Sequence, residues 1–448
     1  MQLLGPHPGR RVLIYFFSAI LIGAIVLSLP VSASEQSIGF LDALFTATSA
    51  ICVTGLIVVD TGSAFSFFGQ IVILILIQLG GLGIMTFTTL ILLSLGTRLT
   101  LNERLSLSQT LESKVQVKPG HLILAVLSTT LLVEGIGALF IYWRFQEVMP
   151  HDQAVYYAIF HSISAFCNAG FSTFSNSLES FSGDYILIFI FSGLIILGGL
   201  GFIVIRELIA AVYAKRLRLS LHSKLCLTAT AVLIVGGTAT IFASEYGNMV
   251  ENLGLSGGLI NSFFQSVTAR TAGFNTIPQT SLTDVSLLIT IILMFIGACP
   301  GSCAGGIKTT TMAIILLVIY NRFLGRARAS IFKRSISENS VTGAFTLFHL
   351  SVIVVLFLLA VFLFTESVSA AHVATKGWFL ENMFEIFSAF GTVGLSMGIT
   401  SNLHDFGKVI IITLMFAGRV GLLTLAFSLA RPPQRGEIVY SDEPVMVG

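Results

Sequence analysis

The chain has 448 residues, of which 54% are hydrophobic and only 10% are charged, and its mean hydropathy is +0.92. Soluble domains carry about 25% charged residues, so this composition excludes an ordinary soluble protein and predicts an integral membrane protein in a lipid bilayer. The net charge of +2 says little about partners, and no nucleic-acid partner is expected.

Eight segments are apolar and long enough to cross the hydrocarbon core, which takes about 20 residues of helix. In chain order the predicted spans cover residues 12–30, 68–95, 121–144, 184–214, 221–244, 285–320, 341–365 and 406–430. Between the two members of each pair lies a shorter semi-apolar stretch of about 12–15 residues, which suits a re-entrant half-helix better than a span. The expected fold class is therefore an all-α integral membrane protein.

The four short stretches resemble one another, which indicates an internal repeat. They read FTATSAICVTGL, FHSISAFCNAGF, FFQSVTARTAGF and FEIFSAFGTVGL. Each has a Phe ten residues before a Gly, in the pairs Phe45 and Gly55, Phe160 and Gly170, Phe263 and Gly273, and Phe384 and Gly394. A Ser-Ala pair precedes the Gly in three copies, whereas the third copy has Val267-Thr268 at that place.

Each copy is predicted to contain a helix, a half-helix with its loop, and a second helix. Repeat 1 covers residues 1–96, repeat 2 residues 97–216, repeat 3 residues 217–325, and repeat 4 with a C-terminal tail residues 326–448. The expected architecture is four tandem helix–pore-loop–helix repeats, with eight transmembrane helices and four re-entrant half-helices, around one pore.

The basic residues predict the orientation. Most of the 24 Lys and Arg residues fall at the termini and in the loops between copies, as in KRLRLSLHSK and RFLGRARASIFKR. Because positively charged loops stay in the cytoplasm, we expect both termini and these loops to be cytoplasmic. The four short stretches then enter the membrane from outside.

The loops that end the short stretches offer backbone carbonyl groups. Gly adopts positive φ readily, and four such loops around one axis can form rings of carbonyl oxygens that replace the hydration shell of potassium. The residues predicted to bind potassium are Val53, Thr54, Gly55, Asn168, Ala169, Gly170, Thr271, Ala272, Gly273, Thr392, Val393 and Gly394. Only the last run has the Thr-Val-Gly order of a potassium-channel filter. The alternative is that the glycines serve helix packing alone.

The sequence GACPGSCAGGIK, residues 297–308, interrupts the sixth predicted span with four Gly and one Pro. A continuous helix does not favour this composition. At 1.5 Å per residue, Cys299 and Arg419 lie about 18 Å and about 20 Å into their spans. Gly80-Gly81 and Gly198-Gly199 lie at similar depths, so all four second helices carry a special feature in one layer. A simple helix kink is the alternative.

Charged side chains inside a membrane are functional candidates. Arg419 is the strongest, and Lys308, at the end of the interrupted segment, could instead reach the cytoplasm. Arg270 is a candidate brace for the loops, with Glu381 or Glu385 as possible acidic partners. Glu134 is expected to be buried beside polar helix neighbours.

No arrangement typical of an enzyme occurs in the sequence. There is no Ser/His pair, paired carboxylate or metal-ligand spacing, and the eight His residues form no cluster. The five cysteines are expected to be free buried thiols. No Gly-rich dinucleotide motif occurs, so no cofactor is expected in this chain besides the transported ion, potassium with sodium as a second candidate.

With these features the chain resembles the Trk/Ktr/HKT superfamily of potassium transporters, and in particular its KtrB-type membrane subunits. The resemblance covers nearly the whole chain. It rests on the four loops and on QLGGLGIMTF (Gln78–Phe87), LGGLGFIVIREL (Leu197–Leu208), GACPGSCAGGIKTTT (Gly297–Thr311) and GRVGLLT (Gly418–Thr424). In plant relatives a Ser replaces the first filter glycine where sodium permeates, so Gly55 favours potassium.

The resemblance implies potassium uptake across the inner membrane of a bacterial cell, stimulated by sodium in a symport. It also implies a homodimer with one pore per subunit and a cytoplasmic ring of RCK-type nucleotide-binding regulatory subunits. Residues 297–307 would form a gate loop below the filter. The gate residues are Cys299, Pro300, Gly301, Ser302, Cys303, Ala304, Gly305, Gly306, Lys308 and Arg419. A sodium-permeable or proton-coupled carrier on the same fold remains the alternative.

Overall fold

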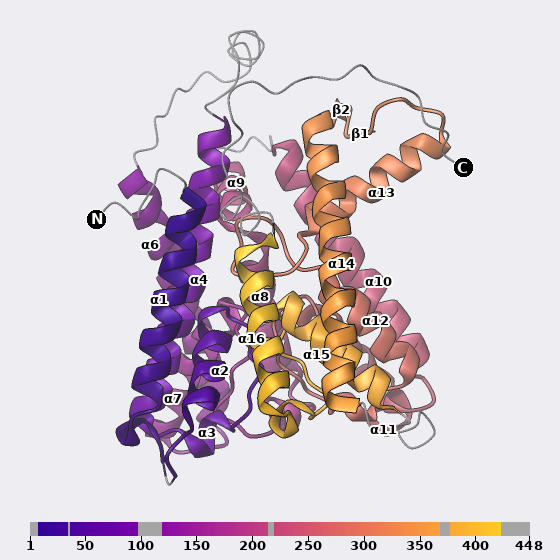
Figure 1. The fold of residues 1–448 in the computed structure, drawn as a ribbon. Coiled ribbons are helices and arrows are strands. Elements are labelled where there is room, and N and C mark those ends of the chain that lie inside the picture. The colour runs from indigo at the N-terminus through magenta and orange to yellow at the C-terminus, as the bar shows by residue number, and fades with distance from the viewer. Residues whose placement is uncertain (1–7, 35, 97–118, 214–218, 368–376, 423–448) are drawn as a thin grey trace.

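The computed structural model describes residues 8–34, 36–96, 119–213, 219–367 and 377–422 (Figure 1). The regular secondary structure of this part is helical apart from one two-stranded hairpin and two isolated β-bridges. Several predictions concern segments outside the described residues: the N-terminus, the start of repeat 2 at 97–118, part of the basic run KRLRLSLHSK and the tail at 423–448. The repeat boundaries stay predictions.

Long helices and shorter helices alternate along the chain. The long helices and their broken counterparts are α1 (Pro8–Leu27), α4 (Phe67–Gly96), α6 (Pro119–Phe145), α8 (Tyr185–Leu200), α9 (Phe202–Tyr213), α10 (Leu221–Ser244), α12 (Asp284–Phe295), α13 (Thr309–Phe323), α14 (Glu338–Ser367) and α16 (Asp405–Val420). The helices that contain the four repeated stretches are α2 (Phe40–Ile51), α7 (His151–Phe166), α11 (Met249–Thr268) and α15 (Trp378–Gly391). We call these four the pore helices.

The remaining elements are single turns and one hairpin. They are η1 (Pro30–Ser32), α3 (Thr61–Ala64), η2 (Glu179–Phe181), η3 (Gln279–Ser281), β1 (Ser330–Ile331), β2 (Arg334–Ser335) and η5 (Thr400–Asn402). The antiparallel hairpin pairs Ile331 with Arg334 and was not predicted. It lies at the top of Figure 1, at the opposite end from α3.

Three described helices are each long and apolar enough to cross a membrane, over Ile123–Phe145, Leu221–Ser244 and Glu338–Glu366. A fourth candidate is the pair Tyr185–Leu200 and Phe202–Ala211, which is bent by 103°. The span predicted over 184–214 is therefore not a straight helix, because Gly201, with φ of 85°, ends α8 and turns the chain. The predicted interruption of the span 285–320 is present between α12 and α13.

The helices pack in a closed cycle. The second helix of each predicted copy contacts the pore helix of the next, in the pairs α4 with α7, α8 with α11, α12 with α15, and α16 with α2. The last pair joins the two ends of the chain, and Lys408 Nζ lies 2.6 Å from Asp42 Oδ1 across it. Many large apolar side chains point outward, among them Leu131, Leu139 and Phe357. An apolar outer surface suits lipid.

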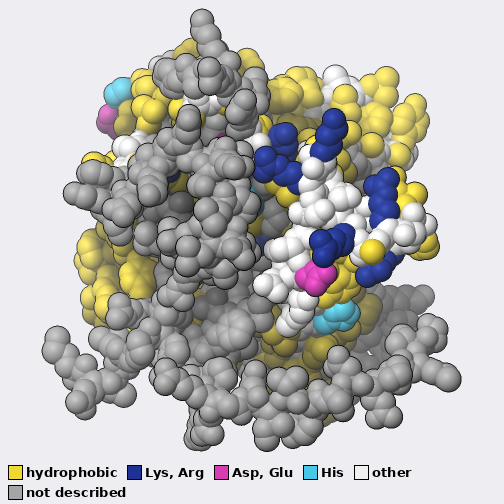
Figure 2. Space-filling view, turned by 90° about the horizontal axis from the view of Figure 1, so that it is seen from above, with side chains coloured by type: hydrophobic (Ala, Val, Ile, Leu, Met, Phe, Trp, Pro, Cys, Tyr) yellow, Lys and Arg dark blue, Asp and Glu magenta, His cyan; other side chains and the backbone are white. Residues whose placement is uncertain are grey.

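Basic side chains gather at one end of the molecule. Figure 2 shows this end, where several Lys and Arg side chains lie on the described surface, and the hairpin between α13 and α14 lies at this end in Figure 1. Arg322, Arg326, Arg328 and Arg334 are all exposed there. The hairpin therefore presents positive charge at the end of the molecule opposite α3.

Glycine allows three of the second helices to touch the last turn of a pore helix. A Cβ atom built on Gly80, Gly198 or Gly418 would come within 3.0 Å of a backbone carbonyl oxygen. The facing oxygens belong to Ile51, Phe166 and Phe390, each four residues before a repeated glycine. Backbone lies on backbone at these points, so a side chain of any size would separate the two helices.

This close contact predicts the effect of a methyl group. Gly198→Ala should lower the free energy of unfolding by about 1–3 kcal/mol, because overpacking forces backbone shifts. Thermal unfolding of the purified protein in detergent measures the change. The control is Gly193→Ala in the same helix, where a Cβ meets nothing within 4 Å. Equal melting temperatures for the two variants would contradict the prediction.

Candidate functional site

The four repeated glycines form a closed ring where the four loops meet. A Cβ atom on each glycine would come within 3.0 Å of the carbonyl oxygen that precedes the glycine of the next loop. The pairs are Gly55 with Ala169, Gly170 with Ala272, Gly273 with Val393, and Gly394 with Thr54. The contacts run in one sense through all four copies and return to the first, so copies 2 and 4 face each other across the ring.

The backbone of the four loops has one shared conformation. The residue two before each glycine has positive φ: 55° at Val53, 59° at Asn168, 70° at Thr271 and 50° at Thr392. Left-handed backbone is uncommon for such residues and marks strain at functional positions. No hydrogen bond from the described residues reaches any carbonyl oxygen of the four three-residue runs. These oxygens are therefore free to bind a cation.

Hydroxyl groups at the ends of the pore helices hold the loops. Ser49 Oγ and Ser388 Oγ accept hydrogen bonds from the backbone N–H of Gly55 and Gly394, at 3.0 and 3.2 Å. Ser164 Oγ donates to the carbonyl of Phe171 in copy 2, at 2.7 Å. The small residues of the sequence repeat thus fix the loop against its own helix.

In the third copy, the residues of the pore helix are shifted by one position relative to the match that the four repeated stretches show in the sequence. Thr268 Oγ1 donates to the carbonyl of Phe274, at 2.6 Å, as Ser164 does in copy 2. Phe264, rather than Phe263, is the fully buried aromatic residue. The spacing from the anchoring hydroxyl to the ring glycine is therefore one residue shorter in copy 3, which agrees with the departure of Val267-Thr268 from the pattern.

The ring opens into a hollow of about 430 Å³. Its lining includes the four ring glycines, two acidic residues, Asp60 and Glu179, and several hydroxyl and amide side chains. Asn275 Nδ2 donates to Glu179 Oε1 at 2.6 Å. Burial raises the pKa of Glu179, and the Asn275 hydrogen bond opposes that rise. We call this hollow the vestibule.

The segment between α12 and α13 packs under the ring and is buried along most of its length. Ile296 and Ile307 form an isolated β-bridge that closes it into a loop. Its backbone binds the end of α8, with Cys299 N donating to Gly199 O at 3.0 Å and Cys303 N to Gly198 O at 3.2 Å. A Cβ on Gly305 would collide with the Thr392 side chain of the fourth loop. We call residues 297–307 the intramembrane loop.

Two positively charged side chains donate hydrogen bonds to backbone carbonyls of the intramembrane loop. Arg419 is 3% exposed, and its guanidinium donates to the carbonyl of Cys303 and, at 2.8 Å, to that of Gly80. Lys308 Nζ donates to the carbonyls of Ala304, at 2.6 Å, and Gly305, at 3.3 Å. Lys308 therefore turns back onto the loop, and its interpretation as a residue that reaches the cytoplasm is wrong.

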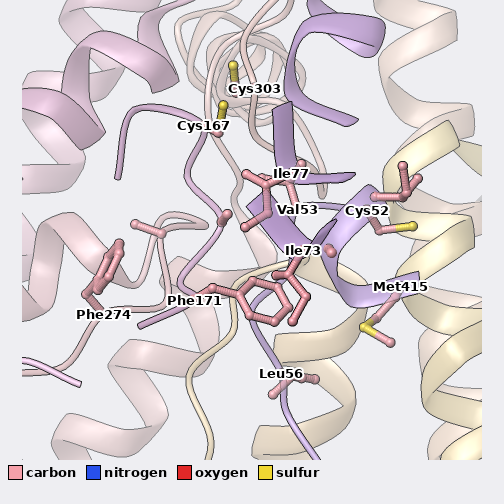
Figure 3. Close-up of a cluster of buried hydrophobic side chains, with 14 of the residues drawn as sticks. Cys52, Val53, Leu56, Ile73, Ile77, Cys167, Phe171, Phe274, Cys303 and Met415 are labelled. Carbon is pink, nitrogen blue, oxygen red and sulfur yellow. The ribbon is translucent and has the colours of Figure 1, made fainter. Parts of the chain in front are cut away.

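The five cysteines are free and buried in the structure, as the sequence predicts. Figure 3 shows Cys167 and Cys303 close together, above Val53 in this view. A Cβ on Gly81 would lie 2.8 Å from Cys167 Sγ and 3.7 Å from Cys303 Sγ, so α4, the second loop and the intramembrane loop meet there. No group of three or more possible metal ligands occurs among the described residues.

The other charged candidates have different partners from those considered in the sequence. Glu385 accepts hydrogen bonds from Ser396 and Thr400, and none of the described ion pairs joins it or Glu381 to Arg270. Glu134 accepts from Gln78 Nε2 at 2.7 Å, as expected for a carboxylate beside polar helix neighbours.

The structure brings the four predicted loops together at the ring glycines and sets Gly305 and Gly306 of the intramembrane loop against the fourth loop. Sequence reasoning missed the vestibule serines Ser172 and Ser396. Each lies two residues after a ring glycine, and this shared offset is the signal that could have identified them.

Comparison with known proteins agrees with these features. A family model described as a cation transport protein, TrkH, matches residues 12–436. The chain is 39% identical to the potassium/sodium uptake protein NtpJ of Enterococcus hirae, over 98% of this chain and 97% of that protein. It is 40% identical to the Ktr system potassium uptake protein B of Bacillus subtilis, over 98% and 97% of the two chains.

A solved structure has the same fold. The potassium transporter TrkH from Vibrio parahaemolyticus superposes with a TM-score of 0.72 at 18% identity, over 96% of this chain and 86% of that one. The extended match to the family model and the identity to full-length relatives lead to one conclusion: this chain belongs to the TrkH family of cation transport proteins.

Proposed function

We propose that the chain carries potassium into a bacterial cell through the ring of loop carbonyls, and that the four repeats form one pore around it. The observation that supports this most directly is the cyclic contact of each glycine with the carbonyl of the next loop. Carbonyl oxygens without hydrogen-bond partners can take the place of water around a dehydrated cation. The relatives named as potassium uptake proteins agree with this choice of ion.

Sodium is the second candidate ion. The Enterococcus relative is named for potassium and sodium together. A sodium-stimulated symport of potassium and a sodium-permeable carrier on the same fold are both compatible with such a name. Ion competition in vesicles separates them, because a sodium-permeable carrier takes up labelled sodium that potassium does not exclude.

The intramembrane loop is proposed as the gate. Its contact with Thr392 sets it directly against the fourth loop, and Arg419 fastens it to α4. Arg419 forms no ion pair within the described chain, so its charge also opposes a cation in this layer. Opening requires only that α13, which follows the loop, pull it away from these contacts.

Further subunits are part of the proposal. The word system in the names of the Ktr relatives suggests more than one component. We propose a homodimer with a separate cytoplasmic nucleotide-binding ring, for which the basic hairpin between α13 and α14 is the nearest described contact surface. In this orientation the hairpin and both termini are cytoplasmic and the vestibule faces outward.

The ring glycines provide the test of the filter. Gly394→Ser should weaken potassium uptake and its preference over sodium about tenfold, because the added atoms crowd the carbonyl of Thr54. Isotope uptake into liposomes, with each ion as competitor, measures both. The control is Gly254→Ala. Gly254 also has a positive φ, of 73°, but a Cβ atom added there would meet nothing within 4 Å. Unchanged ion preference in Gly394→Ser, at equal protein content, contradicts the proposal.

The gate has its own test. Arg419→Ala, or a shortened intramembrane loop, should raise potassium flux about tenfold in liposomes without any regulatory subunit, because states that differ by a few kcal/mol shift readily. Potassium preference should persist, since the ring is unchanged. Arg322→Ala removes an exposed positive charge from α13 and serves as the control. A folded loop variant that conducts no faster than the parent would support the helix-kink alternative.

A further inference from the structure

Three of the four pore helices carry a polar side chain that ties the helix to the segment leaving its loop. In each case this residue directly follows the buried aromatic residue of the repeat, once the one-residue shift of copy 3 is included. The residues are His161 after Phe160, Gln265 after Phe264 and Glu385 after Phe384. His161 and Glu385 are completely buried and Gln265 is 5% exposed.

Copies 2 and 4 use the same arrangement with different chemistry. In copy 2, His161 Nδ1 lies 2.8 Å from the carbonyl oxygen of Tyr157, so Nδ1 carries the hydrogen. In the neutral ring Nε2 is then an acceptor, and Ser172 Oγ donates to it at 3.0 Å. Ser172 Oγ in turn accepts the backbone N–H of Phe174 at 3.0 Å. Ser172 therefore links the turn that follows the loop glycine to the pore helix α7.

In copy 4 the acceptor is a carboxylate. Ser396 Oγ donates to Glu385 Oε2 at 3.0 Å and accepts the backbone N–H of Gly398 at 2.9 Å. Thr400 donates to the other oxygen of Glu385. The serine stands eleven residues after its partner in both copies. Because copies 2 and 4 face each other across the ring, the two matching links lie on one diagonal.

Copies 1 and 3, which form the other diagonal of the ring, do not have a serine link of this kind. In copy 3, Gln265 and Gln279 exchange two amide hydrogen bonds, at 2.7 and 3.2 Å. In copy 1 the equivalent residue, Thr46, donates to the carbonyl of Asp42 in its own helix, at 2.9 Å. Thr61 begins the turn that corresponds to those of Gln279 and Thr400, and its buried hydroxyl has no partner among the described residues. Copy 1 therefore lacks this link.

The links end at the mouth of the ring. Ser172, Ser396 and Thr400 all line the vestibule. Glu385 forms none of the described ion pairs, so burying its carboxyl group is costly and only the two hydroxyl groups compensate. A purely structural anchor in this place could be apolar, like the surrounding Phe residues.

We propose that His161, Gln265 and Glu385 are positioning residues that fix the outer ends of three ring loops and so set which cation fits. The inference rests on the proposed filter function. Where the size of the carbonyl ring sets selectivity, discrimination against the smaller sodium ion depends on carbonyls that resist closing inward. A loop whose following segment is tied to a buried pore helix resists that movement, whereas among the described residues no such link ties the segment after the copy 1 loop to its own pore helix.

The vestibule serines provide the mildest test. Ser172→Ala and Ser396→Ala each remove one hydroxyl group and leave the pore helix intact. Each should weaken potassium preference over sodium about three- to tenfold, the effect of losing one buried hydrogen bond, with the maximal uptake rate retained. Ser172→Thr and Ser396→Thr keep the hydroxyl and should restore the preference. Liposome uptake of labelled potassium and sodium gives both quantities.

Two comparisons make the outcome decisive. Thr46→Val in copy 1 removes a buried hydroxyl at the equivalent position without breaking a link, and should leave ion preference unchanged.

If Gly394→Ser changes the preference but neither Ala variant does, the positioning role is overturned and the filter stands. If Gly394→Ser also leaves the preference unchanged, the filter proposal fails and the positioning role fails with it. Reduced protein content with unchanged preference in the Ala variants shows a purely structural role and overturns the inference.

Discussion

The carbonyl oxygens of four loops lie together without a hydrogen-bond donor from the described chain, and this unusual condition governs the rest of the structure. In an apolar environment each unpaired carbonyl costs free energy unless something else satisfies it. The chain keeps the loops in this state by left-handed backbone before each glycine and by hydroxyl groups on the pore helices. Strain in the loops is therefore balanced by contacts made elsewhere in the same copy.

Contacts between backbone and backbone recur in the layer below the ring. Gly80, Gly198 and Gly418 let three second helices touch the carbonyl ends of pore helices. In the third copy the helix is interrupted instead, and the intramembrane loop occupies this layer. The third copy therefore differs from the other three in this layer, and this asymmetry is the reason why the intramembrane loop is proposed as the gate.

The four copies share a plan but not their chemistry. A hydroxyl, an imidazole, an amide and a carboxylate occupy the same place after the buried aromatic residue of each pore helix, at Thr46, His161, Gln265 and Glu385. A pore made of identical subunits cannot vary one loop alone. A single chain with four copies can, so each loop of the ring can be held by different chemistry.

The sequence by itself determined the membrane class, the helical fold and the four recurring stretches whose glycines meet in the ring. Composition and periodic recurrence are local properties, and they survive in any arrangement of the helices. It could not determine the bend at Gly201, the one-residue shift of copy 3 or the partners of Lys308 and Glu385. The bonds of Lys308 and Thr268 span only four and six residues, but their donors and acceptors come within reach only when the backbone turns between them, and no periodic pattern in the sequence predicts those turns.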